Sequence, residues 1–347
     1  MSKLLKVFGI VLLIGAIVTA VVGYYAYVLV FGPNVNDTKN EQAHVLFIPT
    51  GAGYNQVLDS LKKNQILVDE WAFEQVAKQM NYPNKVYPGR YLIKPKMSNR
   101  DLVIMLRRGE QTPYNFTINN IRTREQFITL VGTTLEADSL KFNELLKDIN
   151  YLKTQGFTPD NVLSVFMSDT YKFNWNTNEK KFFERMLKEY KAFWTTERKK
   201  MAEAQGLSPY ECIILAAIVE EEVAKMDEMN KVAGVYLNRL RKDWPLQADP
   251  TIKFAVGDFT LKRILNKHLE VDSPYNTYKN AGLPPGPIRI PSKAAIKAVL
   301  NPIKHDYMYF CAKEDFSGYH NFAKTLREHN VNAKKYQREL NRKKIMK

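Results

Sequence analysis

The sequence of 347 residues contains only two cysteines, Cys212 and Cys311, and both lie in apolar runs. This scarcity excludes a disulfide framework and a repeated CxxC zinc pattern, and it favours two buried thiols over a single disulfide. Glycine and proline, with 16 residues each, are too few for a collagen-like or low-complexity chain. The composition is that of an ordinary folded protein.

Motifs of metal and nucleophile chemistry are also missing. The five histidines form no HExxH pair, and the chain contains neither a GxSxG nor a Walker A sequence. The sequence therefore predicts no metal site and no cofactor.

Acidic residues are outnumbered, since 51 Lys and Arg face 36 Asp and Glu, which leaves a net charge of +15. Such a surface attracts anions, which include nucleic acid, acidic lipid headgroups and anionic polymers. The length predicts about two domains with at least one sizeable core.

Residues 7–31 carry no formal charge and are rich in aliphatic and aromatic side chains. About 20 apolar residues suffice for a membrane-spanning helix. Lys3 and Lys6 precede the run and Asp37 follows it, so the positive-inside rule places residues 1–6 in the cytoplasm and the rest outside. This topology argues against nucleic acid as a partner.

A cleaved signal peptide is the alternative for this run. Its apolar core is normally 7–15 residues long and ends at a site of small residues. Here the run is longer and continues through Tyr24, Tyr25 and Tyr27, which suit the interfacial belt of an uncleaved anchor.

The outer part begins with a polar linker over residues 32–43. The pattern then predicts strand, helix, helix and strand from His44 to Ile93, and a helix from Ser98 that ends before Gly109. A second sheet starts near Phe116, and helical periodicity dominates over 124–204, with one long amphipathic helix over 178–204. A basic amphipathic helix is expected from Lys324 to the end of the chain.

A further helix begins at Ser208, with Pro209 at its first position and Glu211 closing a capping box. Residues 212–219 include no polar side chain, so this helix is expected to be buried nearly all round. Three glutamates, Glu220, Glu221 and Glu222, follow directly. At about 100° per residue they cannot all face the same way, so at least one points toward the buried side.

Glu220 shares a helix face with Ile213, Ala216, Ala217 and Ala224, and these mostly small residues leave room for a ligand. Desolvation there would raise the pKa of Glu220 and make it a proton donor at neutral pH. The alternative is that all three are surface glutamates at a helix exit.

Four blocks follow downstream: GVYLNRLR at 234–241, LQADPT at 246–251, SPYNTYKNAGLPPGPIRIPS at 273–292 and GYHNFAKTLREHN at 318–330. Their amide and tyrosine side chains suit sugars. The alternatives are a loop-forming pair for Asp249-Pro250, a turn packed by aromatics for SPYNTY, and a structural imidazole for His320, which is slightly favoured over a substrate contact.

LAAIVEEE at 215–222, LQADPT, SPYNTY, GLPPGPI and GYHNF with REHN together resemble the YceG-like endolytic murein transglycosylases (MltG), in that family's order. The resemblance covers the whole chain. It implies an α+β fold with one N-terminal transmembrane helix (7–31), a small LysM-like βααβ module (44–110) and a larger, mostly helical catalytic domain (111–347).

The resemblance implies that Glu220 is the catalytic acid and base. Further residues are implied, with His320, to line the substrate site: Asn238, Gln247, Asp249, Tyr275, Asn276, Thr277 and Tyr278. The sequence departs from the family pattern at Glu221, where a lysine is usual and where a second carboxylate could raise the Glu220 pKa. It also departs at 166–171, which lacks a proline and leaves the role of 160–175 open.

The implied reaction is cleavage of MurNAc-β-1,4-GlcNAc bonds within peptidoglycan strands, giving 1,6-anhydroMurNAc ends and terminating strand elongation. The implied partners are glycan strands and peptidoglycan synthases, at the outer face of the cell (inner) membrane. Two alternatives stay open: a hydrolytic muramidase that uses Glu220 and Asp249, and a non-catalytic peptidoglycan-binding scaffold.

Overall fold

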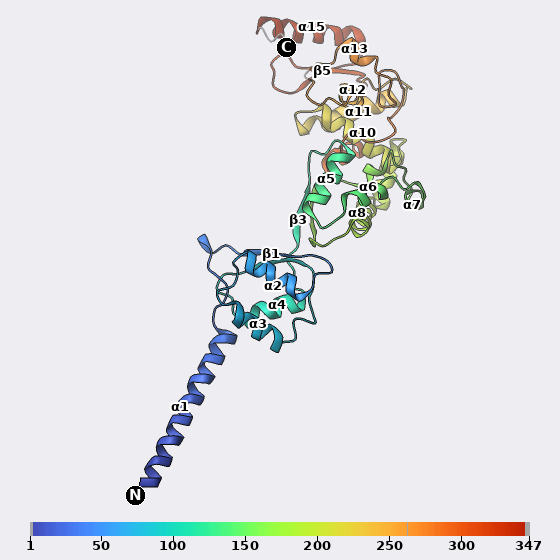
Figure 1. Cartoon of the computed structure of the whole chain (residues 1–347). Coiled ribbons are helices and arrows are strands. Elements are labelled where there is room, and N and C mark those ends of the chain that lie inside the picture. Colours follow the sequence, from blue (N-terminus) through green and yellow to red (C-terminus); the bar gives the residue numbers. More distant parts are fainter. Residues whose placement is uncertain (1–2, 262, 344–347) are drawn as a thin grey trace. The chain divides into compact units, whose positions relative to one another are not determined.

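The computed structural model describes residues 3–261 and 263–343 and divides into two compact units (Figure 1). Unit 1 holds the chain up to Asn115 with the short segments Thr134–Glu136 and Lys172–Thr177, and unit 2 holds the remainder. Helices dominate both, and the strands of the described residues form two-stranded sheets, as an α+β chain requires. Residues 1–2 of the predicted cytoplasmic segment and 344–347 of the predicted C-terminal helix lie outside the described residues.

Unit 1 has the expected order of strand, helix, helix and strand behind a long N-terminal helix. Its elements are α1 (Lys3–Phe31), β1 (His44–Ile48), α2 (Tyr54–Lys63), α3 (Glu70–Gln79), β2 (Gly89–Ile93) and α4 (Asn99–Arg108). β1 pairs antiparallel with β2, with His44 opposite Ile93. The Ser98 side chain caps α4, and Gly109 ends it in the left-handed conformation, as the sequence predicts.

Helix α1 is uncovered along most of its length (Figure 1). Residues Lys6–Phe31 have a mean hydropathy of 2.5, and the most apolar window is 0% buried. This helix is apolar all round and is not covered by protein. Its length of apolar residues is sufficient to cross a bilayer.

Unit 2 contains most of the remaining elements, and β3 and β4, which pair with each other, are each divided between the two units. In order they are β3 (Tyr114–Ile118), α5 (Arg124–Thr134), α6 (Ser139–Leu145), α7 (Ile149–Thr154), β4 (Asp169–Phe173), α8 (Glu179–Phe193), α9 (Thr196–Ala204), α10 (Pro209–Glu222), α11 (Met229–Leu240), α12 (Asp249–Val256), α13 (Asn266–Leu269), α14 (Lys293–Leu300), β5 (Tyr309–Ala312), β6 (His320–Ala323) and α15 (Leu326–Arg342).

One prediction for this region is wrong. The single helix expected over 178–204 is broken between α8 and α9, because the Thr195 side chain accepts a hydrogen bond from the Arg198 amide and starts a new helix, while the Trp194 side chain turns into the core. The prediction that helices dominate over 124–204 is confirmed; the short strand β4 lies among them, and its Tyr171 and Phe173 alternate with exposed residues.

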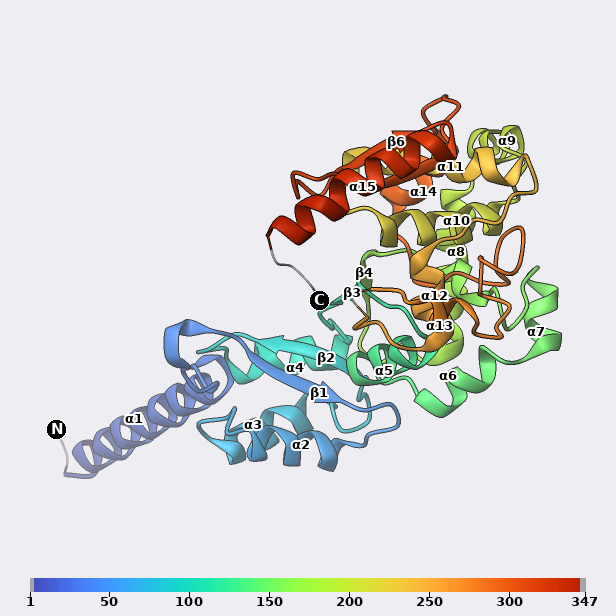
Figure 2. The same cartoon turned by 90° about the horizontal axis from the view of Figure 1, so that it is seen from above.

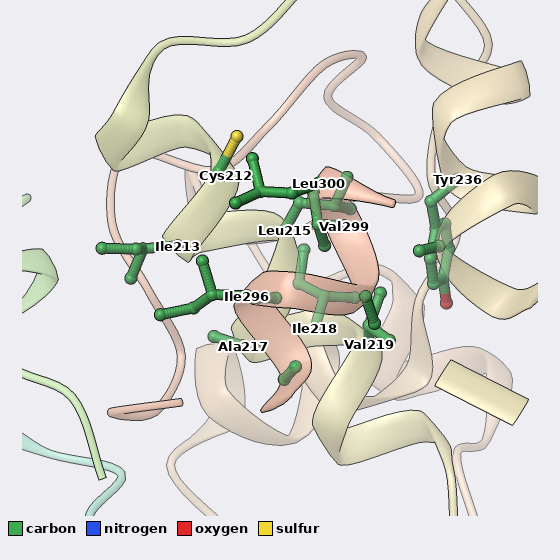
Figure 3. Packing of buried hydrophobic residues seen from close by; sticks show 14 of the residues in the cluster. Cys212, Ile213, Leu215, Ala217, Ile218, Val219, Tyr236, Ile296, Val299 and Leu300 are labelled. Atoms are coloured by element: carbon green, nitrogen blue, oxygen red, sulfur yellow. The ribbon is translucent and has the colours of Figure 1, made fainter. Parts of the chain in front are cut away.

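Helix α10 is the centre of the larger core, as the sequence predicts. Its capping box is present, and every residue from Cys212 to Val219 is buried. Figure 3 shows α14 side chains, including Ile296 and Val299, lying against α10, with Tyr236 of α11 nearby.

Both cysteines are free. At the other side of this unit α15 lies along the β5–β6 hairpin (Figure 2).

Candidate active site

A cavity of about 470 Å³ lies in unit 2 where α10 ends. Its walls come from segments that are far apart in sequence. They are the ends of α10 and α11, the start of α12, the loop between α13 and α14, the β5–β6 hairpin and α15. The lining residues are Glu222, Arg239, Gln247, Asp249, Tyr278, Tyr309, Phe310, Cys311, Ala312, His320, Leu326 and His329.

Glu222, the last residue of α10, reaches this cavity. The buried Tyr236 hydroxyl donates a hydrogen bond of 2.6 Å to its Oε1. Desolvation raises the pKa of Glu222 to about 7, the nearby Asp249 charge adds to the rise, and the Tyr236 hydrogen bond and Arg239 oppose it. Glu222 can therefore both donate and accept a proton near neutral pH.

Asp249 stands at the first position of α12 and is exposed to the cavity. The Tyr278 hydroxyl donates to its Oδ1 at 2.6 Å, and burial together with this carboxylate holds the pKa of Tyr278 well above its usual value. Tyr278 therefore remains a donor, and Asp249 remains a hydrogen-bonded carboxylate beside Glu222.

Arg239 supplies a buried cation to the same wall. Its guanidinium donates to the Met308 carbonyl at 2.8 Å and to the Leu246 carbonyl. It therefore joins the segment just before β5 to the loop before α12. Burial lowers the pKa of Arg239. The side chain is thus held in place by backbone oxygens and is well positioned to favour negative charge in the cavity.

His320 lies on the cavity wall and contacts a buried acid. Its Nδ1 is 2.8 Å from Oε2 of Glu228, and its backbone amide donates to Oε1 of the same carboxylate. These two contacts fix the orientation of the imidazole ring at the cavity wall.

Glu220 and Glu221 lie in a different environment from that of Glu222. The Ser292 amide donates to Glu220 at 2.7 Å, and Arg289 lies 3.8 Å away. Glu221 pairs with Arg122 and Arg289 at 2.9 and 2.8 Å. These contacts join α10 to neighbouring segments. Ala216 and Ala217, the small residues beside Glu220, are buried in the core and are not open to a ligand.

Four other predicted site residues do not line the cavity. Asn238 donates to the carbonyls of His305 and Tyr307, and Asn276 donates to those of Leu269 and Val271. Tyr275 packs on Phe254. Each of these three therefore holds a loop.

Thr277 is buried and acts on the cavity from behind. Its hydroxyl accepts from the Ala248 amide at 3.0 Å and contacts the Thr251 hydroxyl at 2.8 Å, while its carbonyl accepts from the Gln247 amide. Thr277 thus positions Gln247 and Asp249, and Gln247, Asp249, Tyr278 and His320 line the cavity.

Sequence reasoning did not single out Glu222, Arg239 and Tyr309, which line the cavity, or Tyr236, which bonds Glu222. Helical periodicity shows that the three glutamates diverge, but it does not show which one meets Tyr236, 14 residues away. Both Tyr236 and Arg239 lie within GVYLNRLR, so that block carried the signal.

A carboxyl group whose pKa burial raises to about 7, in a cavity lined largely by polar and aromatic side chains, is suited to general acid–base chemistry. Comparison with known proteins identifies the family. The model of the YceG-like family matches residues 46–335. The chain therefore belongs to this family.

Curated relatives share one name. The Endolytic murein transglycosylase of Bacillus subtilis (strain 168) is 34% identical over 311 residues, which cover 83% of each chain. The protein of that name from Streptococcus pneumoniae (serotype 2, strain D39) is 29% identical over 88% of this chain and 61% of its own length. A solved structure of a putative YceG-like protein from Listeria monocytogenes aligns with a TM-score of 0.56 and 27% identity, over 84% of this chain and 99% of that one.

Proposed function

We propose that this chain is an endolytic murein transglycosylase in which Glu222 is the general acid and base. The name of its relatives gives the reaction class, and the family match extends over most of the chain, including the whole cavity. The observation that carries the residue assignment is the raised pKa of Glu222, about 7, on the wall of that cavity.

The reaction needs one group that first gives and then takes a proton. Protonated Glu222 donates to the oxygen that links MurNAc C1 to GlcNAc, and the C1–O bond breaks with GlcNAc as the leaving group. Ionised Glu222 then takes the proton of the MurNAc C6 hydroxyl, whose oxygen closes on C1 to form the 1,6-anhydro ring. No water enters, and the carboxyl group ends protonated, ready for another cycle.

The surroundings of Glu222 serve both steps. The Tyr236 hydrogen bond fixes the carboxyl group and stabilises its ionised form between the two proton transfers. Burial, with a smaller contribution from the Asp249 charge, keeps the resting acid protonated, and that charge favours the oxocarbenium character that develops at C1. Gln247, Tyr278 and His320 supply hydrogen bonds to sugar hydroxyl and amide groups.

A hydrolytic muramidase is the second candidate, because Asp249 places a second carboxylate on the same cavity wall as Glu222. In that reaction Asp249 would activate water or attack C1. The two reactions give different chain ends.

Mass spectrometry of fragments released from purified glycan strands distinguishes them. We expect internal cleavage products that end in anhydroMurNAc, 18 Da lighter than hydrolytic products by the mass of one water. Products with reducing ends would establish hydrolysis. A protein that binds the strands without cleaving them would establish the non-catalytic scaffold.

We further propose that α1 anchors the chain in the cell membrane with residues 1–6 in the cytoplasm and both units outside. The length and exposure of α1 support an anchor, and Lys6 before the span supports this orientation. External protease should digest a C-terminal tag on intact spheroplasts. Full protection of the tag would contradict this topology.

The resemblance also supports two finer assignments. We propose that residues 44–110 act as a LysM-like glycan-binding module and that the enzyme contacts peptidoglycan synthases while it terminates strand elongation. Deletion of 44–110 should weaken binding of glycan strands while cleavage that depends on Glu222 is kept. Crosslinking in cells should capture a peptidoglycan synthase.

A further inference from the structure

The last turn of α1 is joined to α3 and α4 by a buried polar network. Asn99, which is 1% exposed, donates to the Leu29 carbonyl at 2.9 Å and accepts from Asn34 at 2.6 Å. Asn34 also donates to the Asp69 carbonyl and accepts from the Asp69 amide, each at 2.7 Å. The helix exit is therefore fixed to unit 1 instead of being a loose tether.

A cavity of about 480 Å³ lies at this junction. One wall is apolar and includes Leu29 and Val30 of α1 with Val76 of α3 and Met80. The rim is polar and carries Gln75, Gln79 and Arg100. The cavity thus combines an apolar side continuous with the membrane-spanning helix and a side that donates hydrogen bonds.

Its position fits the boundary of a bilayer. The apolar run ends at Phe31, so the cavity opens at the level of the lipid headgroups. Trp71 is 55% exposed and lies one turn before Gln75 on the same face of α3. Exposed tryptophan is typical of this interfacial layer.

The charge at the rim favours an anion. The Arg100 guanidinium lies 5.8 Å from the Phe31 ring, which directs it toward the end of α1. Its acidic neighbour, Asp101, is 3.4 Å away, and both side chains are about half exposed, so this pair is weak. Arg100 therefore keeps donors for a phosphate group.

We propose that the α1–α3–α4 junction is a binding site for one anionic phospholipid, with the phosphate at Arg100 and one acyl chain along Leu29, Val76 and Met80. The rest of the lipid stays in the bilayer. This proposal rests on the proposed anchoring by α1, and it is independent of the active site. A bound lipid would fix the depth and tilt of unit 1 at the membrane surface.

The test uses the full chain in nanodiscs that contain equal amounts of phosphatidylglycerol and phosphatidylcholine, with native mass spectrometry of the lipid retained after release. We expect one phosphatidylglycerol per chain. Arg100→Gln should reduce the preference for it about fivefold, the effect of one cation near an anionic surface. Gln75→Trp should fill the cavity from its rim and abolish retention.

Arg108→Gln is the matched control, because Arg108 lies on the same helix, is exposed and does not line the cavity. It should retain phosphatidylglycerol as the unchanged chain does. A chain that enters nanodiscs and retains no phosphatidylglycerol, or an Arg100→Gln chain with unchanged preference, overturns the lipid site. A chain that does not enter nanodiscs overturns the anchoring itself, so the two failures are distinguishable.

Discussion

The last turn of α10 places carboxyl groups of the same type in two contrasting regions. On one side, Glu220 and Glu221 meet Arg122, Arg289 and the Ser292 amide. On the other, Glu222 meets Tyr236, a cavity and the charge of Asp249. The arginine side joins segments through ion pairs, whereas burial on the cavity side raises the pKa of Glu222. The surroundings, and not the position in a run of glutamates, determine the chemistry of each group.

The largest difference should come from matched amide substitutions. Glu222→Gln keeps the size and the acceptor for Tyr236 but cannot transfer a proton, so we expect the rate of anhydro-end formation to fall about 10²–10⁴-fold. Glu220→Gln and Glu221→Gln should each lose less than about tenfold when assayed at equal folded concentration. Loss of activity in Glu220→Gln with activity kept in Glu222→Gln would return the catalytic role to Glu220.

Stability should respond to pH through Glu222 in the opposite direction from an ordinary surface carboxyl group. Its pKa is raised from 4.5 to about 7, so the folded state binds the proton more tightly than the unfolded state. The stability that this group contributes is present below pH 4.5 and is lost as pH rises through 7, by up to about 3 kcal/mol.

Urea unfolding at pH 5 and pH 8 tests this effect. Wild type should lose stability relative to Glu222→Gln between these two values, because the amide has no buried charge to form. An equal difference between the two proteins at both pH values would show that Glu222 titrates normally.

The arginine side should affect stability more than catalysis. Arg289→Met removes the partner of Glu221 and leaves Arg122 as its remaining cation, at a cost of about 2 kcal/mol for a partly buried pair. The rate of anhydro-end formation per folded Arg289→Met molecule should change little. Arg185→Met is the control, since Arg185 pairs with Glu189 on the exposed face of α8. If both substitutions changed the free energy of unfolding equally, the contacts of Arg289 with the α10 glutamates would have no special structural role.

The smallest effect is expected behind the cavity. Thr277→Val loses the acceptor for the Ala248 amide and the contact with Thr251, which should cost about 1–2 kcal/mol and raise KM more than it lowers kcat. Thr277→Ser keeps the hydroxyl and should restore both. If Thr277→Ser does not restore stability and KM, packing and not hydrogen bonding determines the conformation of the loop that carries Gln247 and Asp249.

Local signals were sufficient for much of the fold. The caps at Ser98 and Ser208, the apolar run 212–219 and the membrane-length helix each depend on residues close in sequence. The break at Trp194 was missed because the amphipathic pattern of the flanking helices continues across it. The contrast between Glu220 and Glu222 could not be predicted, because Tyr236, Asp249 and Arg289 reach α10 from other elements, and a single helix does not reveal what packs on each face.

The pH dependence of the initial rate tests most directly whether the cavity sets the chemistry of Glu222. Protonated acid is needed at the start, so kcat/KM should fall as pH rises through about 7. Asp249→Asn removes a charge that raises this pKa, so the same fall should move to lower pH. A wild-type rate that falls already near pH 4–5, the range of an ordinary glutamate, or a fall that Asp249→Asn leaves in place, would contradict the assignment.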